Sequence, residues 1–132
     1  MSTYADLPEL PAEGWATRFL GEQSAIGLPL NSTSQALENS RRVKAGAGTL
    51  LSITGFNNKA AAQFIQVFDA SDVPADGAIP VIVLTVATVA NFSLIYSVAG
   101  RAFRTGIVVC NSSTLVTKTI ALADCWFDVQ YV

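Results

Sequence analysis

The residues of this chain that could carry chemistry are few, and their types exclude most common reactions. The sequence contains no histidine, which removes the commonest general base and the commonest protein ligand of metals. A Ser–His or Cys–His nucleophile is therefore impossible, and Cys110 and Cys125 alone do not make a zinc site. No glycine-rich phosphate loop of the usual spacing occurs. The sequence predicts no catalytic residue, no metal, no cofactor and no enzyme activity.

Three aspartates, Asp69, Asp72 and Asp76, flank a short loop and could hold Ca²⁺ through oxygen ligands. Their spacing matches no calcium-binding loop, so we expect a solvated turn that keeps the neighbouring hydrophobic strands soluble. Paired carboxylates for glycoside hydrolysis would need a substrate cleft and one carboxyl with a raised pKa. The sequence indicates neither.

Both cysteines, Cys110 and Cys125, fall within predicted strands. A disulfide between facing strands is one alternative. Buried reduced thiols fit better, because nothing else in the chain is typical of a secreted disulfide scaffold. The first residues also lack the basic start and apolar run of a signal peptide.

The composition favours one folded domain, part of whose surface is covered by a partner because few residues are charged. Of 132 residues, 51% are hydrophobic and only 14% are charged, which argues against a disordered body. The net charge is −2 and there is no basic run, so we expect no nucleic-acid partner. Residues 1–40 carry one basic and five acidic side chains, against seven basic and five acidic in the remainder.

An uncharged stretch, residues 77–100, is long enough to span a bilayer. Pro80, Asn91 and Ser93 interrupt it, and Ala90-Asn91 is typical of a turn. We therefore expect two buried strands there and no membrane segment.

The elements that must position any site are predicted to be β-strands. In the last nine residues, Cys125, Phe127, Val129 and Tyr131 alternate with more polar side chains, which indicates a strand with one buried face. Similar segments, bounded by turn residues, lie at 41–45, 49–56, 63–69, 81–86, 91–98, 103–110 and 115–122. The turn at Asn57-Asn58-Lys59 predicts that 49–56 and 63–69 form a hairpin. About eight short strands predict an antiparallel, jelly-roll-like β-sandwich over residues 41–132.

Residues 1–40 are predicted to form an extended N-terminal arm. They contain three of the five prolines, which hold a chain extended and keep it out of a sheet interior. A disordered leader is the alternative. An arm that docks on a neighbour fits better, because a solvated tail has no reason to carry so many large apolar groups. The candidate anchors are Leu10, Trp15, Phe19 and Leu20.

Two predicted strands, 63–68 and 81–86, are apolar on both faces. A two-layer sandwich buries one face of each strand, so the other face should be covered by a partner subunit or an arm. This predicts a homo-oligomer with exchanged arms, specifically a trimer around a cyclic axis. The candidate interface residues are Phe64, Phe68, Arg101, Arg104 and Trp126.

Two of these interface assignments have alternatives. Arg101 and Arg104 could face a carboxylate of a partner chain, or they could be edge charges that prevent aggregation. Trp126 lies on the less apolar face of the last strand, so it contacts either the rim of the second sheet or a partner.

Several runs of this sequence resemble small virion proteins of tailed bacteriophages. They are Ala61-Ala62-Gln63-Phe64-Ile65-Gln66-Val67-Phe68-Asp69-Ala70, Val73-Pro74-Ala75-Asp76-Gly77-Ala78-Ile79-Pro80-Val81, Gly100-Arg101-Ala102-Phe103-Arg104-Thr105-Gly106-Ile107-Val108-Val109-Cys110-Asn111-Ser112-Ser113 and the closing run from Ala123 to Val132. The resemblance covers about residues 43–132 and excludes the arm.

The resemblance implies a β-sandwich on the surface of a virion, made in the host cytoplasm. It implies a capsid decoration (cement) protein that binds the major capsid protein of the same particle and stabilises it through the arm. A head or tail fibre module that contacts a host receptor is the alternative. A carbohydrate-binding β-sandwich is a further alternative, with Trp126 and Tyr96 as the candidate aromatic contacts.

Overall fold

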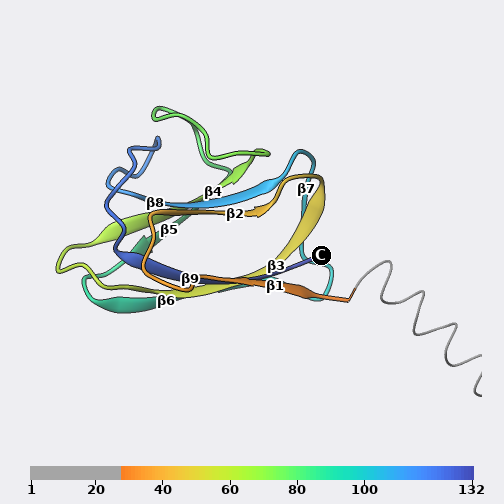
Figure 1. The fold of residues 1–132 in the computed structure, drawn as a ribbon, viewed down its shortest axis with the longest axis horizontal. Coiled ribbons are helices and arrows are strands. Elements are labelled where there is room, and N and C mark those ends of the chain that lie inside the picture. Colours follow the sequence, from red (N-terminus) through yellow and green to blue (C-terminus); the bar gives the residue numbers. More distant parts are fainter. Residues whose placement is uncertain (1–27) are drawn as a thin grey trace, which may run out of the picture.

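The computed structural model describes residues 28–132, and all their regular structure is β-strand (Figure 1). The all-β prediction is confirmed. Within this range there is no helix long and apolar enough to cross a membrane. In chain order the strands are β1 (Leu30–Thr33), β2 (Ser40–Lys44), β3 (Gly48–Asn57), β4 (Gln63–Asp69), β5 (Ile82–Val86), β6 (Ala90–Ile95), β7 (Arg101–Phe103), β8 (Ile107–Ser112) and β9 (Cys125–Tyr131).

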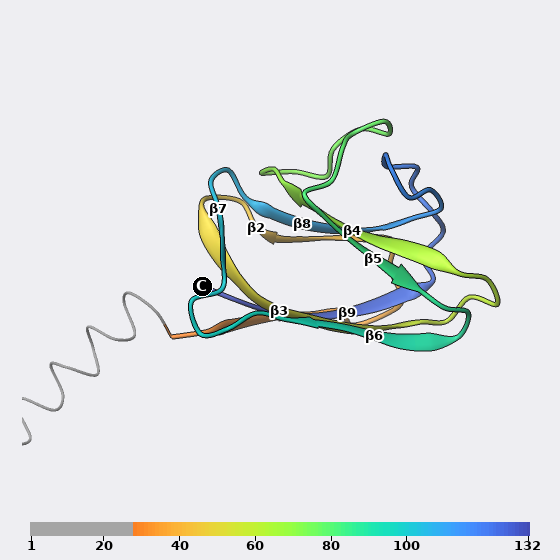
Figure 2. The ribbon, with the colours of Figure 1, turned by 180° about the vertical axis from the view of Figure 1, so that it is seen from behind.

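The strands form two antiparallel sheets that face each other (Figures 1 and 2). Sheet A has the order β1-β9-β3-β6, and sheet B the order β2-β8-β4-β5. Strand β7 pairs with the beginning of β3 and β6 with its remainder, so β6 and β7 share one position in sheet A. The sandwich prediction is confirmed.

The pairing follows that of a jelly roll, in which a long double ribbon is wrapped around a core. From the ends of the ribbon inward, β1 pairs with β9, β2 with β8, β3 with β6 and β7, and β4 with β5. Further pairing of β3 with β9 and of β4 with β8 closes each sheet. The two chain ends of the sandwich therefore lie side by side in sheet A.

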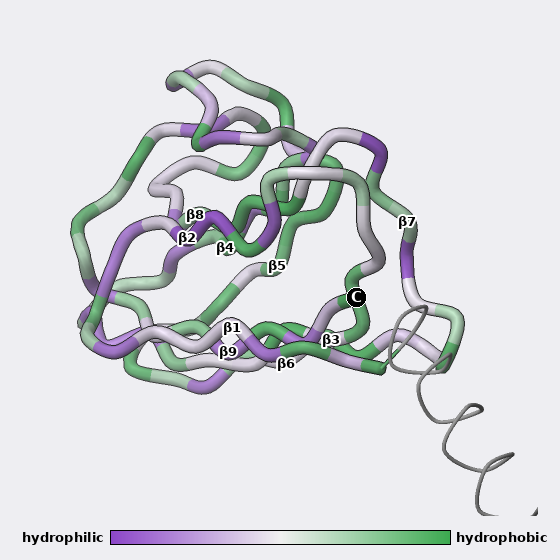
Figure 3. The backbone as a smooth tube through the Cα atoms, turned by 45° about the vertical axis from the view of Figure 1, so that its right-hand side comes forward, coloured by the Kyte–Doolittle hydropathy of each residue, from purple (hydrophilic) through white to green (hydrophobic). Residues whose placement is uncertain are grey.

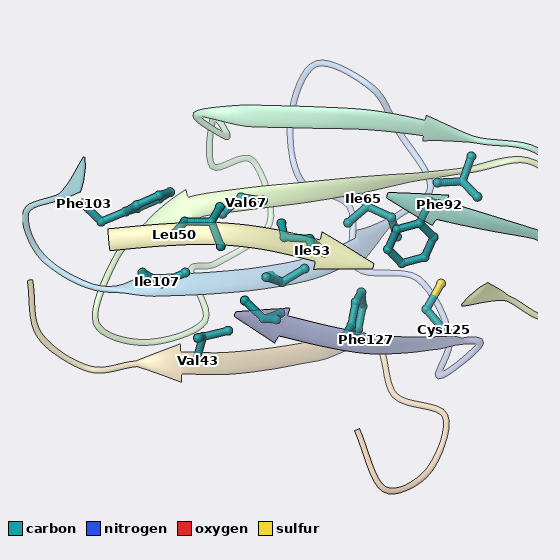
Figure 4. Close-up of a cluster of buried hydrophobic side chains, with 13 residues drawn as sticks. Val43, Leu50, Ile53, Ile65, Val67, Phe92, Phe103, Ile107, Cys125 and Phe127 are labelled. Atoms are coloured by element: carbon teal, nitrogen blue, oxygen red, sulfur yellow. The ribbon is translucent and has the colours of Figure 1, made fainter. Parts of the chain in front are cut away.

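The main core fills the space between the sheets (Figure 4). The alternation predicted for the last strand is confirmed, because Cys125, Phe127 and Val129 are fully buried. The ring of Phe127 meets that of Phe92 edge-on, with centroids 6.2 Å apart, which is a favourable aromatic geometry. The other buried members are Val43, Leu50, Ile53, Ile65, Val67, Val86, Phe103, Ile107 and Val109.

A second, smaller core lies on the outer face of sheet B. Phe68, Val108 and Cys110 are buried there, with Ala70 and Ala78 packed against them. The cover comes from the chain itself, through the loops after β4 and after β8. The prediction that this face needs a partner subunit is therefore wrong at Phe68, which is 3% exposed and is a core residue of its own subunit.

Two predictions about strand pairing are corrected. Strands β3 and β4 do not form a hairpin, because β3 lies in sheet A and β4 in sheet B. The turn at Asn57 instead carries the chain from one sheet to the other. Residues 115–122 are not a strand; they form a loop that joins sheet B only through a bridge between Ile120 and Ser112.

The sandwich begins earlier than the predicted boundary at residue 41. Strand β1 pairs with β9 from Leu30 onward, although its Asn-Ser-Thr sequence is polar. An edge strand can carry these polar side chains, because one of its faces is solvated. Residues 1–27, and with them Leu10, Trp15, Phe19 and Leu20, lie outside the described residues.

Candidate assembly surfaces

An open apolar groove of about 620 Å³ crosses the outer face of sheet A at the end where β1 begins and β9 ends. Ile95 and Val98 are 73% and 99% exposed, and neither is covered by another part of the described chain. We call this feature the terminal groove. Its lining carries no charged side chain and comprises Pro29, Thr49, Leu51, Ser52, Ile95, Tyr96, Ser97, Val98, Ala99, Gln130 and Val132.

Local structure explains why these apolar groups are presented to solvent. The chain leaves β6 at Ile95 and returns as β7 at Arg101, so residues 96–100 are a short excursion between two pieces of one strand position. Gly100 ends the excursion with a φ of 69° and lies close to Thr49 and Leu51, where a side chain would collide. The excursion therefore lines the groove together with the beginning of β3 and the end of the chain after β9. Figure 3 shows β7 and the C-terminus at the same end of the molecule.

A second apolar surface is formed by the two loops that cover sheet B, residues 70–81 and 113–124, which we call the loop crown. Both loops rise from sheet B on the side away from sheet A in Figures 1 and 2. They hold seven large apolar side chains that are exposed by 36% or more: Val73, Ile79, Val81, Leu115, Val116, Ile120 and Leu122.

The loop crown is held as one unit by a mostly buried lysine. Lys118 is 4% exposed, and its ammonium donates to Asp76 at 2.7 Å. The backbones also pair, because the N–H of Gly77 donates to Lys118 and the N–H of Lys118 donates to Ala78, both at 2.8 Å. Burying an ammonium is costly unless it is paired, so the ion pair commits the two loops to one arrangement.

Gln66 fixes the second loop of the crown to sheet B. Its side chain is fully buried on the outer face of β4, and its amide donates to the carbonyls of Thr114, Leu115 and Thr117 at 2.9, 3.1 and 3.2 Å. The exposed apolar groups of the crown are thus carried on a fixed backbone, which suits a binding surface better than a mobile loop does.

Away from the terminal groove, the outer face of sheet A carries an aromatic pair among polar side chains. Trp126 lies directly opposite Phe56, and Phe56 opposite Asn91. Trp126 points away from sheet B, so its predicted contact with the rim of the second sheet is excluded. A shallow pocket of about 410 Å³ lies beside it, lined by Thr54, Gly55, Phe56, Asn91, Phe92, Ser93 and Trp126.

The remaining predicted interface residues are scattered over the sandwich. Arg101 is used inside its own subunit, because it donates to the carbonyl of Val81 at 3.2 Å and lies over the ring of Phe103 at 5.8 Å. The side chain of Arg104 is exposed, and Phe64 is half-buried on the outer face of β4. The structure brings none of these residues together with Trp126.

The three aspartates considered for Ca²⁺ each have a different partner. Asp69 accepts hydrogen bonds from the backbone N–H groups of Arg104, Thr105 and Gly106. The hydrogen bond from the backbone of Thr105 is the largest of the causes that lower the pKa of Asp69. Asp72 pairs with Arg42, and Asp76 pairs with Lys118. Among residues 28–132 no group of three potential metal-binding side chains occurs.

Both cysteines are buried and form no disulfide, which agrees with the prediction of buried reduced thiols. Cys125 belongs to the main core and Cys110 to the outer core on sheet B. Burial raises the pKa of Cys110 to about 11 and that of Cys125 to about 12. Neither thiol is a nucleophile at neutral pH, since the thiolate is the reactive form.

The terminal groove and the loop crown were both missed by sequence reasoning. For the crown a signal existed: Gln66 is a polar residue between the apolar Ile65 and Val67. It marks a place where a buried polar group ties one segment to another. For the groove the sequence offered only an apolar residue, Val98, two positions before Gly100.

Comparisons with known proteins give little further information. No protein-family model matches the chain, and no curated protein matches it significantly. Among solved structures, the coat protein of tobacco streak virus superposes with a TM-score of 0.40 and 11% sequence identity, over 77% of this chain and 84% of that one. A similarity of this size supports no inference about function.

Proposed function

We propose that this protein is a structural component of a virion, which binds the outer surface of a capsid and stabilises the particle. Its partner is the major capsid protein of the same particle, and its N-terminal segment makes the attachment. The body is a jelly roll, an architecture used by viral capsid proteins and by lectins. The sequence resemblance to small virion proteins of tailed phages points to the same role.

One observation carries this proposal: a rigid body presents unpartnered apolar surface at the point where an apolar segment joins it. Leu28 and Leu30 are 48% and 55% exposed, and they flank Pro29, which lines the terminal groove. A protein with no large partner has no reason to keep such a concentration of apolar groups at one end.

The mechanism is energetic and involves no reaction. Each docked segment buries apolar area that stabilises the contact by about 25 cal/mol per Å². Several segments from one oligomer attach together, so each later attachment is intramolecular and avidity rises steeply. A capsid held in this way resists internal pressure that single contacts would not withstand.

Deletion of residues 1–27 tests the proposal. The deletion should stop before Leu28, because removal of β1 would strip the edge of sheet A. Co-sedimentation with purified capsids lacking the protein should show loss of binding by the deletion variant. A control that lacks only residues 1–5 removes none of the four anchors and should bind normally. Unchanged capsid occupancy without residues 1–27 would contradict the proposal.

The pocket beside Trp126 favours a second candidate, an adhesin or carbohydrate-binding module. A half-buried tryptophan beside Asn91, Ser93 and Thr54 offers a stacking face together with hydroxyl and amide groups. Under this candidate, a glycan array should show binding that is lost on Trp126→Ala and retained on Val116→Ala in the loop crown. Absence of glycan binding by the unmodified protein would contradict this second candidate function.

A further inference from the structure

The terminal groove is an apolar surface that the described chain does not cover. Four residues at this end of the sandwich, Leu28, Leu30, Ile95 and Val98, are among the large apolar side chains that the described chain leaves exposed. The lining has no charged side chain, so charged or nucleic-acid ligands are disfavoured. Its shape and chemistry suit a short apolar peptide with an aromatic anchor.

The chain supplies such a peptide close by. Residues 15–20, Trp-Ala-Thr-Arg-Phe-Leu, contain two aromatic side chains and a leucine within six positions. They precede Leu28 closely enough that the chain from Trp15 to Leu28 spans at most roughly 45 Å when extended. A domain of 100 residues has a radius of gyration of about 13 Å. The extended segment is therefore long enough to reach from one sandwich to the surface of an adjacent one.

The direction in which the chain leaves the sandwich favours the groove of another molecule. Pro29 lines the groove itself, and β1 begins directly after it. A residue before proline is restricted to extended conformations, so Leu28 continues the course of β1 away from the sheet. Occupying its own groove would require the chain to reverse direction between Leu28 and residues 15–20 and to cross back over sheet A.

We propose that residues 15–20 of one copy occupy the terminal groove of a neighbouring copy, with Trp15 or Phe19 as the buried anchor. This deepens the proposed function and rests on it, because it names what residues 15–20 of the N-terminal segment bind. Leu7 and Leu10 are then left beyond the neighbour to contact the capsid. The donor end and the acceptor groove lie at the same end of the molecule, so a cyclic axis beside that end brings each donor to a neighbouring acceptor.

The test measures the mass of the full-length chain in solution, without capsids, by light scattering and sedimentation. We expect an oligomer that dissociates when Val98→Asp or Ile95→Asp places a charge in the groove, with a dissociation constant weakened about tenfold or more. Both side chains are largely exposed, so neither change should disturb folding. Val116→Asp in the loop crown is the matched control, equally exposed as Ile95 at 73%, and should leave the mass unchanged.

A crosslinking experiment separates exchange between molecules from folding back. Chains carrying Phe19→Cys are mixed with chains carrying Val98→Cys and oxidised; both native cysteines are fully buried and should not interfere. We expect a disulfide between the two different chains. A disulfide that forms only within a chain carrying both substitutions would overturn the inference.

The inference and the proposed function fail in different ways. If the groove variants keep the oligomer while deletion of residues 1–27 still abolishes capsid binding, the inference is wrong and the decoration role stands. If the groove variants dissociate but capsids are never bound, the exchange stands and the role is wrong. If the groove variants keep the oligomer and lose capsid binding, the groove receives the capsid protein instead, and the inference is overturned.

Discussion

Asn57 joins two turns through one fully buried side chain. Its amide donates to the carbonyls of Ala61 and Ala87 at 3.0 and 2.9 Å. Its oxygen accepts from the backbone of Lys59 and the side chain of Gln63 at 3.1 and 3.0 Å. The residue therefore fixes the corner at which the chain leaves sheet A for sheet B and also the end of β5.

We predict that Asn57→Ala lowers the free energy of unfolding by about 3 kcal/mol, because buried donors and acceptors lose their partners. Urea denaturation followed by tryptophan fluorescence measures this. Asn58→Ala is the control: its neighbouring side chain is exposed, and we expect a change within about 0.5 kcal/mol. Equal effects of the two substitutions would contradict the role assigned to Asn57.

Asp69 makes stability depend on pH in the acid range. Its pKa lies below the ordinary value of 3.8, first because of the hydrogen bond from the backbone of Thr105. The folded form thus favours the carboxylate more than the unfolded form does. The stabilisation is present above the unfolded pKa and is lost as pH falls through the lower, folded pKa.

We therefore predict that Asp69→Asn is less stable than the unmodified protein at pH 7 and that the difference shrinks at pH values below about 4. Urea midpoints at several pH values measure it. Asp72→Asn provides the control, since Asp72 forms an exposed ion pair with Arg42 and such pairs contribute little. A constant difference between pH 7 and pH 3 would rule out this origin.

At the scale of elements, the turn between β5 and β6 is strained. Val89 has a φ of 43°, in the left-handed region that β-branched residues rarely adopt. Its side chain is 54% exposed, so little packing compensates, and its N–H donates to the carbonyl of Lys59 at 2.9 Å. The neighbouring elements hold this residue in a conformation that it does not prefer.

We predict that Val89→Gly raises the free energy of unfolding by roughly 1 kcal/mol, because glycine adopts this φ freely. The measurement is the thermal midpoint. Val116→Gly is the matched control: Val116 is also exposed, but it does not have a positive φ. It should give no gain. A loss of stability at position 89 equal to that at 116 would count against strain.

The loop crown shows how a backbone can be fixed in one arrangement without regular secondary structure. Its backbone is fixed by Gln66 from below and by the Lys118–Asp76 pair between the loops. Residues 115–122 alternate in the sequence as a strand does, yet Val116 and Leu122 are 73% and 69% exposed. The alternation therefore does not mark a buried face.

At the scale of the whole molecule, two cores of different depth stabilise the fold. The main core is enclosed by both sheets, whereas the outer core is covered by the loop crown alone. Each core contains one cysteine, so the reactivity of each thiol reports whether its core has opened. Opening of the crown exposes Cys110, but exposure of Cys125 needs the sheets to separate.

We predict that both thiols of the native protein react slowly with a disulfide reagent at pH 8. At a pKa of about 11 for Cys110 against the ordinary 9.0, the thiolate fraction falls roughly a hundredfold. In rising urea, Cys110 should become reactive before Cys125, because loops open before sheets separate. Labelling of Cys110→Ser and Cys125→Ser variants measures each thiol. Simultaneous exposure of both would show that the crown and the sandwich unfold as one unit.

Local patterns were sufficient to predict the strands and the fold class. The alternation of Cys125, Phe127 and Val129 with polar residues is a property of neighbouring positions, because a strand turns successive side chains to opposite faces. Most of the strands and the sandwich were predictable for this reason. Turn residues marked the ends of most strands, although the boundary of the N-terminal arm was placed too late because polar β1 is indistinguishable from a linker.

Only the tertiary structure decided how strands pair and what covers each face. The sequence by itself determined which residues share a side of a strand, since that depends on adjacent positions alone. It did not determine that β3 and β4 belong to different sheets, nor that Lys118 and Ala78 cover Cys110. It also did not place Pro29 beside Val98 in one groove. These arrangements join segments far apart in the chain, and the free energy that selects them comes from contacts that no local pattern contains.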